Sequence, residues 1–294
     1  MVFLILSILS STAIFITFKL IGRYKINTFS AIIINYIVAC LAGFFLSNSF
    51  PSPTQIVTSQ WFPVSLLIGV MFIIMFWIIG LSTQKAGVAV TTVAGKLSVI
   101  IPIAFSIWYE ANDKLTPVKL TGIVLALVAV VLTSYRQKHS DGEQKKFLLP
   151  LILFLGMGIV DSFVKYAQAA YVSDEVNPIF SATVFGIAGI TGFLALPFNK
   201  DATKDFGKLK TWALGIVLGL VNFGSIYFII GALNHIDINT GQQAEGSIIF
   251  GINNLSIVVL SVILGFVLFR ERPSKVNWAG IALSVMAILI LTTL

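Results

Sequence analysis

The chain has 294 residues, of which 57% are hydrophobic and only 11% are charged, against about 25% charged residues in an ordinary soluble domain. A mean hydropathy of +0.97 excludes a water-soluble fold, because a soluble protein must cover its surface with polar groups. Nineteen Lys and Arg against twelve Asp and Glu give a net charge of +7. In a soluble protein this would suggest a nucleic-acid partner, but the placement of the charges argues against one.

Ten stretches are long and apolar enough to cross a bilayer as α-helices. A crossing takes about 20 residues, because roughly 30 Å of hydrocarbon is spanned at about 1.5 Å per residue. In chain order the ten stretches cover residues 2–21, 27–46, 61–80, 88–109, 117–135, 147–170, 178–198, 211–233, 240–268 and 277–293. The sequence therefore predicts an all-α integral membrane protein with ten transmembrane helices.

Lys and Arg residues outside these spans lie almost entirely on one side of the predicted membrane. The loops after spans 1, 3, 5, 7 and 9 hold Arg23, Lys25, Lys85, Arg136, Lys138, Lys145, Lys146, Lys200, Lys204, Lys208, Lys210, Arg270, Arg272 and Lys275, whereas the opposite face holds only Lys114 and Lys119. Because cytoplasmic loops carry an excess of Lys and Arg, we expect the lysine-rich face in the cytoplasm and both termini outside. The expected location is the cell membrane, with a bacterial inner membrane favoured.

The second half of the chain repeats the first. Residues 113–123 align with residues 271–281 at an offset of 158, and the same offset places Lys96 on Asn254. Each half has five spans, an odd number, so the second copy must be inserted upside down. Such inverted repeats hold a substrate near the membrane midplane and open to one side at a time. The expected boundaries are residues 1–135 for the first repeat, 136–146 for a cytoplasmic linker and 147–294 for the second repeat.

Each half ends with an acidic residue, a short turn and a helix. A glycine in this helix follows the acidic residue by nine positions in both halves, from Asp113 to Gly122 and from Glu271 to Gly280. Together with ten helices in two five-helix halves, this pattern resembles the EamA branch of the drug/metabolite transporter superfamily over essentially the whole chain. The resemblance implies that helices 1 to 4 and 6 to 9 surround a central cavity and that helices 5 and 10 pack to the side. We attach no functional meaning to the exchange of Asp113 for Glu271.

Five ionisable residues fall within the predicted spans, namely Lys19, Lys96, Asp161, Lys165 and Glu245. Each costs about 2.5 to 3.5 kcal/mol on membrane-insertion scales, so such residues usually face a cavity or a partner. Lys96 is roughly eight residues from the nearer end of its span, which is about 12 Å and too far for its ammonium to reach the surface. We therefore expect Lys96 to line the cavity.

The other four leave alternatives open. Asp161 and Lys165 share a helix face, which suits either a structural ion pair or a pair that opens to release Lys165 for an anionic group. Lys19 and Lys165 hold equivalent places in the two repeats, yet Lys19 is close enough to the end of its span to reach the cytoplasmic surface instead. Glu245 lies either in an exposed loop or in a water-facing helix start, where it would carry a proton or pair with a cavity lysine.

Amides and aromatic residues complete the candidate substrate site. Asn35, Asn222 and Asn254 find no partner in lipid, so they either line the cavity or bridge helices. The repeat relation with Lys96 favours the cavity for Asn254. Trp77 and Tyr227 would supply an apolar wall with a polar tip, although aromatic residues in spans mostly serve packing or the interface.

Three in-span lysines against two acids favour a substrate with a carboxylate or phosphate, and a zwitterion such as an amino acid would suit both signs of charge. The predicted function is therefore a secondary active transporter that moves a small polar metabolite by alternating access. Export of apolar or cationic compounds is the alternative within transport. A membrane-embedded enzyme or scaffold is the rival from another class.

We expect no enzymatic activity and no bound metal or cofactor. The sequence has no nucleotide-binding loop of the Gly-x-x-x-x-Gly-Lys-Ser/Thr type and no recognisable catalytic motif. Its two histidines are far apart, and Cys40 is its only cysteine. Energy would then come from a proton or solute gradient, or from exchange. The expected partners are the substrate, the lipid bilayer and a coupling proton or exchanged solute, with no nucleic acid, and a homodimer is left open.

Overall fold

The computed structural model describes residues 2–47, 51–101, 104, 116–134, 144–172, 176–233 and 246–292, and every regular element in these ranges is helical. The longer helices are α1 (Val2–Arg23), α2 (Thr28–Leu46), α4 (Phe62–Lys85), α5 (Val88–Leu97), α7 (Pro117–Ser134), α8 (Gln144–Ala170), α9 (Asn177–Ala195), α11 (Leu209–Leu233), α12 (Gly246–Phe269) and α13 (Lys275–Thr292). Three short helices are α3 (Pro53–Val57), η1 (Leu196–Phe198) and α10 (Lys200–Phe206).

Within the described ranges, six helices are long and apolar enough to cross a membrane, and four more apolar helices are shorter. The six lie in α1, α2, α4, α9 with η1, α11 and α12, and the four shorter ones lie in α5, α7, α8 and α13. Each of the ten predicted spans thus overlaps a described helix. The prediction of an all-helical, multi-pass membrane protein is confirmed.

The fourth predicted span differs from a single long helix. Helix α5 ends at Leu97, and a turn at Ser98 and Val99 follows it. Ser98 Oγ donates to the Gly95 carbonyl at 2.7 Å, and the Ile101 amide donates to the Ser98 carbonyl at 3.0 Å. A side chain that hydrogen-bonds its own backbone competes with regular helical bonding, so the helix is interrupted within the predicted membrane depth.

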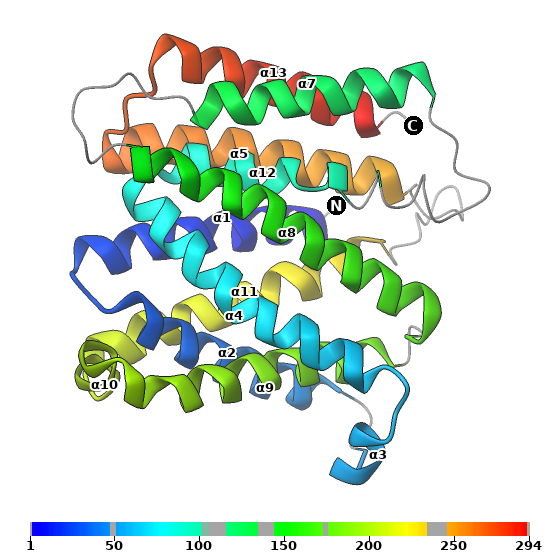
Figure 1. Cartoon of the computed structure of the whole chain (residues 1–294), viewed down its shortest axis with the longest axis vertical. Helices are drawn as coiled ribbons and strands as arrows, with labels where there is room; N and C mark the ends of the chain where they lie inside the picture. The colour runs from blue at the N-terminus through cyan, green and yellow to red at the C-terminus, as the bar shows by residue number, and fades with distance from the viewer. Residues whose placement is uncertain are drawn as a thin grey trace.

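The helix ends gather at two opposite faces of the molecule (Figure 1). Helices α1 and α12 end, α5 and α13 begin, and α10 lies on one face, whereas α1 begins and α13 ends on the other (Figure 1). We call the first of these the basic face. Its described basic residues are Arg23, Lys25, Lys85, Lys200, Lys204, Lys208, Lys210, Arg270, Arg272 and Lys275.

Helices from the two halves pack in matched pairs. With α1, α2, α4, α5 and α7 matched in order to α8, α9, α11, α12 and α13, the contact of α1 with α11 corresponds to that of α8 with α4. In the same way, α2 with α11 corresponds to α9 with α4, and α1 with α12 to α8 with α5. The pairs α2 with α9, α5 with α12 and α7 with α13 join each helix to its own counterpart. These contacts are therefore unchanged when the halves are exchanged.

Glycines allow α11 and α2 to approach closely. A Cβ atom built on Gly215 would lie 2.7 Å from Ile34 Cβ, and one built on Gly219 would lie 2.7 Å from Val38 Cβ. The two glycines are one helical turn apart and so present the same face to α2. Small residues at such contacts let membrane helices pack by close backbone approach.

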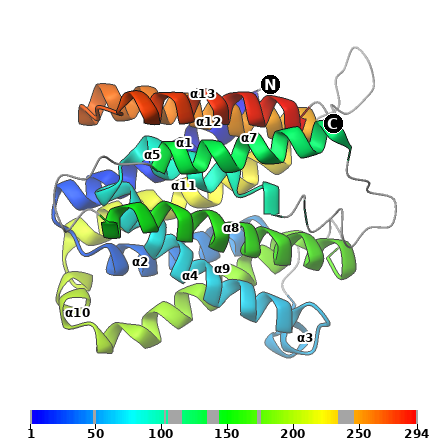
Figure 2. The same ribbon diagram turned by 45° about the horizontal axis from the view of Figure 1, so that its top comes forward.

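Helices α7 and α13 form a pair at one edge of the molecule, far from α2 and α9 (Figures 1 and 2). The Asn277 amide donates to the carbonyls of Leu132 at 3.2 Å and Thr133 at 2.7 Å, at the end of α7. One turn later, a Cβ atom on Gly280 would lie only 2.5 Å from the Thr133 backbone nitrogen. The glycine of the repeated motif is thus the point where the two helices touch.

The short helix α10 is fastened to the start of α2. Asp205 accepts a hydrogen bond from the Asn27 backbone N–H at 2.7 Å and another from Lys208 at 2.5 Å. Ser30 Oγ donates to the Ala202 carbonyl at 2.7 Å. The hydrogen bond from Lys208 and that from Asn27 hold the pKa of Asp205 below its ordinary value, although partial burial opposes this effect.

We expect Gly280→Leu to push α13 away from α7, because the added side chain meets backbone rather than a movable side chain. Overpacking of this kind costs about 1 to 3 kcal/mol, so the melting temperature of the protein in detergent should fall. Ala279→Leu, at an exposed neighbouring position, is the matched control. Equal melting temperatures for the two variants would show that the contact is looser than described.

The attachment of α10 should depend on pH through Asp205. Because the pKa of this carboxyl is lowered in the folded protein, the stabilisation is complete above the carboxyl's ordinary pKa and disappears as the pH falls through the lowered value. The protection of residues 200–206 against hydrogen exchange, relative to an unfolded chain at the same pH, should therefore fall in acid for the native protein. In Asp205→Asn this protection should be low at every pH. Asp201→Asn should behave as the native protein does. A native-like profile in Asp205→Asn would contradict this role.

Candidate functional site

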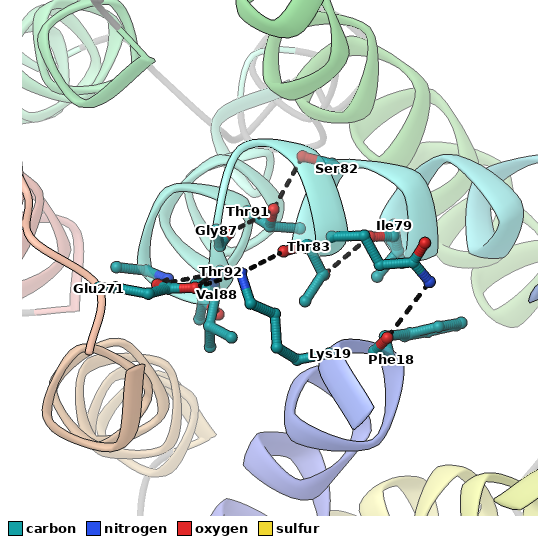
Figure 3. Close-up of polar contacts among 12 residues, drawn as sticks. Phe18, Lys19, Ile79, Ser82, Thr83, Gly87, Val88, Thr91, Thr92 and Glu271 are labelled. Atoms are coloured by element: carbon teal, nitrogen blue, oxygen red, sulfur yellow. Dashed lines mark hydrogen bonds and ion pairs between the residues drawn. The ribbon is translucent and has the colours of Figure 1, made fainter. Parts of the chain in front are cut away.

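The start of α5 rests on a carboxylate from the other half of the chain. Both Glu271 carboxylate oxygens lie 3.0 Å from the Val88 backbone nitrogen, and Oε2 lies 3.5 Å from that of Ala89 (Figure 3). The first N–H groups of a helix have no partner within it, and a negative charge complements the positive end of the helix dipole. Glu271 therefore satisfies and stabilises the start of α5.

Gly87 makes room for this contact. Its φ angle is +108°, in a region that only glycine adopts readily. A Cβ atom at this position would also lie 3.0 Å from Glu271 Oε2. Backbone conformation and space thus both require glycine before α5.

Lys19 completes the cluster from α1. Its Nζ lies 2.7 Å from Glu271 Oε1 and donates to the Thr83 carbonyl at 3.3 Å (Figure 3). It also lies 6.0 Å from the centre of the Phe269 ring. The Lys19 and Glu271 side chains are only 22% and 14% exposed, so water screens their attraction less than at an open surface. The ion pair links the first helix to the turn that follows α12.

A cavity of about 730 Å³ adjoins this cluster at the basic face, and we call it the basic vestibule. Its lining consists of Lys19, Gly22, Arg23, Gln84, Val267, Leu268, Phe269 and Arg270. Three of these side chains are cationic and none is acidic. Gln84 is held in place by hydrogen bonds to the Phe18 carbonyl at 3.3 Å and to Thr28 Oγ1 at 2.8 Å.

A second charged pair lies at the other end of α5. Lys96 is in the last turn of α5, and Asp161 lies on α8, which packs against α5. Ser98 Oγ, in the turn that interrupts the span, lies 3.5 Å from Asp161 Oδ2. Both charged residues have intermediate exposure. We call Lys96, Ser98 and Asp161 the interior site.

Asn254 lies at the same depth as the interior site. A Cβ atom on Gly265 of α12 would be 3.6 Å from Val88 Cβ at the start of α5, and α12 runs back along α5 from there (Figure 1). At about 1.5 Å per residue, Asn254 is about 17 Å from this contact and so level with the turn that follows Lys96. Its exposure is also intermediate.

The other predicted site residues lie elsewhere. The Asn35 amide is 3.1 Å from the Asn222 amide and 3.2 Å from the Leu218 carbonyl, so these buried amides join α2 to α11. Trp77 and Tyr227 are each 44% exposed, and Tyr227 stacks on Phe223 at a ring distance of 5.8 Å. The side chain of Lys165 and all of Glu245 lie outside the described residues.

The role of Glu271 was missed from the sequence. The available signal was its place at the start of the repeated acidic motif, but its hydrogen-bond partner Val88 is 183 residues away. Only the folded chain brings the carboxylate to a helix start. Its counterpart Asp113 lies outside the described residues.

The chemistry offered by both sites is ion pairing and hydrogen bonding. In the part of the chain that the structure describes, no three His, Cys, Asp or Glu side chains gather as metal ligands. The interior site presents one positive and one negative group beside a hydroxyl. The basic vestibule presents positive groups and an amide.

We expect Glu271→Gln to weaken the join between α1, α5 and α12, because the amide keeps the shape of the side chain but loses its charge. For a half-buried pair the cost should be about 1 to 3 kcal/mol, between surface and buried values. Glu271→Gln, Lys19→Met and the double variant form a cycle of melting measurements in detergent. The double variant should cost less than the sum of the two single variants. Strictly additive losses would show that the pair contributes nothing, and Asp201→Asn at an exposed position is the control.

Comparison with known proteins agrees with the resemblance seen in the sequence. The EamA-like transporter family matches residues 145–293. An uncharacterized protein of Haemophilus influenzae is 30% identical over 296 residues, which cover 97% of this chain and 95% of the relative. A solved crystal structure that is 15% identical shares the fold with a TM-score of 0.60 over 98% of this chain and 94% of that chain. This chain belongs to the EamA-like transporter family, within the drug/metabolite transporter superfamily.

Proposed function

We propose that this protein is a secondary transporter that moves a small zwitterionic or anionic metabolite through the membrane by alternating access. Membership of a transporter family supports transport rather than catalysis. The interior site supports the choice of substrate, because Lys96 and Asp161 place opposite charges where a helix is interrupted. Interrupted helices line the substrate sites of many transporters, since their free backbone groups and end dipoles face the site.

The packing of the helices supports the mechanism. The most extensive contacts between the halves have counterparts after exchange, as α1 with α11 has in α8 with α4, or join a helix to its own counterpart, as α2 joins α9. Two copies that pack symmetrically are interchangeable, so a rocking motion that closes one face produces the mirrored arrangement at the other. We propose two inverted five-helix repeats, residues 1–135 and 147–294, with the interior site between them and the basic face in the cytoplasm.

The charges of the interior site favour a substrate with a carboxylate. The Lys96 ammonium lies at the carbonyl end of α5, where the helix dipole stabilises a cation, and an incoming carboxylate would share this ammonium with Asp161. A substrate amino group would in turn face Asp161. The Asp161 carboxylate is also compatible with a cationic substrate. A proton bound to the same carboxylate is a candidate coupling ion.

Lys96→Met keeps much of the length of the side chain but removes its charge, so we expect it to weaken the binding and transport of carboxylates. Succinate, alanine and tetraphenylphosphonium serve as anionic, zwitterionic and cationic probes in melting assays, since a ligand selective for the folded state raises its stability. Saturable uptake of the stabilising compound is then measured in proteoliposomes, and should fall at least about tenfold because a charge-assisted contact is lost.

Lys200→Met, at an exposed position on the same protein, is the matched control and should transport normally. Unchanged uptake in Lys96→Met would remove Lys96 from the route. Stabilisation by tetraphenylphosphonium alone, lost in Asp161→Asn but kept in Lys96→Met, would favour the export of cationic compounds instead.

A further inference from the structure

The basic vestibule has binding capacity that the proposed transport site does not use. Lys19 has three N–H donors, and two of them face Glu271 and the Thr83 carbonyl. Arg23 and Arg270 each bring five side-chain donors, and neither guanidinium makes a hydrogen bond or ion pair with the described residues. Three cationic side chains with donors to spare therefore line one cavity.

The acidic residue nearest this cavity is already engaged. Glu271 accepts from the first N–H groups of α5 and pairs with Lys19, and it is not among the residues that line the cavity. Its single charge is thus shared between a helix start and one ammonium. The cavity as a whole keeps an excess of positive charge, which attracts anions and repels cations.

Arg270 has a backbone conformation that arginine rarely adopts. Its φ angle of +53° lies in the left-handed region, where glycine or asparagine usually ends a helix. An arginine at this position strains the backbone, and such strain is common at functional sites. The strained residue directly precedes Glu271 and lines the vestibule.

The size and the apolar side of the cavity indicate the class of ligand. A volume of about 730 Å³ is in the range of small-molecule sites, about 300 to 1,000 Å³. Val267, Leu268 and Phe269 add apolar side chains to the lining. Guanidinium groups match carboxylate and phosphate oxygens in pairs of hydrogen bonds. An organic oxyanion with an apolar portion fits these features.

We propose that the basic vestibule is a binding site for a carboxylate or phosphate group, separate from the interior site at the far end of α5. Lys19, Arg23 and Arg270 bind the oxyanion, whereas the Gln84 amide N–H groups are already donated to the Phe18 carbonyl and Thr28 Oγ1. The oxyanion belongs either to a soluble metabolite or to the headgroup of an anionic lipid, which basic residues at a membrane surface attract. The proposal holds whether or not the interior site carries a transported substrate.

Inorganic phosphate is the probe that tests the site. The native protein in neutral detergent is titrated with phosphate at constant ionic strength, and its melting temperature is followed. Arg23→Gln combined with Arg270→Gln removes two exposed cations, and Lys200→Gln combined with Lys204→Gln removes two exposed cations of the same face outside the vestibule. We expect saturable stabilisation of the native protein and of the control, and at least about tenfold weaker phosphate binding in the vestibule variant.

Equal phosphate dependence in both double variants would overturn the proposal, because binding would then follow net charge alone. Loss of phosphate binding in Lys96→Met, with full binding in the vestibule variant, would also overturn it and would place the anion at the interior site. If the native protein binds phosphate through the vestibule but transports no carboxylate, the proposed transport route is rejected. The proposed vestibule site is then unaffected.

Nanodiscs separate the two sources of the oxyanion. The same titration is run in phosphatidylcholine alone and in a mixture with phosphatidylglycerol. Phosphate binding that disappears only in the mixture assigns the site to a lipid headgroup. Binding that persists in both assigns it to a soluble anion. Both results support an oxyanion site, whereas no vestibule-dependent phosphate binding in phosphatidylcholine nanodiscs would contradict it.

Discussion

Hydrocarbon offers no hydrogen-bond partner, so every polar group within a membrane helix must be satisfied by the protein or by enclosed water. Many hydroxyls here are satisfied within their own helix, as when Thr83, Thr92 and Thr183 donate to the carbonyl four residues earlier. Asn35 and Asn222 meet between two helices. Charges cannot be satisfied so locally. The structure gathers the described ones within the spans at two places, the basic vestibule and the interior site.

Helix α5 connects these two places. It has ten residues, with the Glu271 carboxylate at its positive end and the Lys96 ammonium at its negative end, so both charges complement its dipole. Val88 and Lys96 are about 12 Å apart along the helix. Because Glu271 belongs to the second half and α5 to the first, a movement of one half against the other must either carry this short helix along or break its contact with Glu271. Helix α5 therefore joins the pair of Lys19 and Glu271, beside the vestibule, to the interior site.

Much of this fold could be predicted from the sequence, because hydropathy and Lys and Arg placement report directly on lipid and on the two membrane faces. The repeated motif likewise predicted the family. The structure explains why residue 280 is glycine, because a side chain there would meet the backbone of Thr133. Contacts between distant residues could not be predicted. Sequence spacing pairs Asp161 with Lys165 on one helix, whereas attraction between Asp161 and Lys96 depends on how α8 packs against α5. The hydrogen bonds of Glu271 to Val88, and the break after Leu97, likewise depend on tertiary context.

We propose that Lys96 faces water between the two halves, although it lies at membrane depth. The chain has a single cysteine, Cys40, so Cys40→Ser gives a background for Lys96→Cys and, on the same helix, for Val93→Cys, where the native side chain is fully buried. A membrane-impermeant thiol reagent is added to the protein in sealed vesicles from each side in turn. The account predicts that Lys96→Cys is modified and Val93→Cys is not. Equal resistance of both positions from both sides would contradict it.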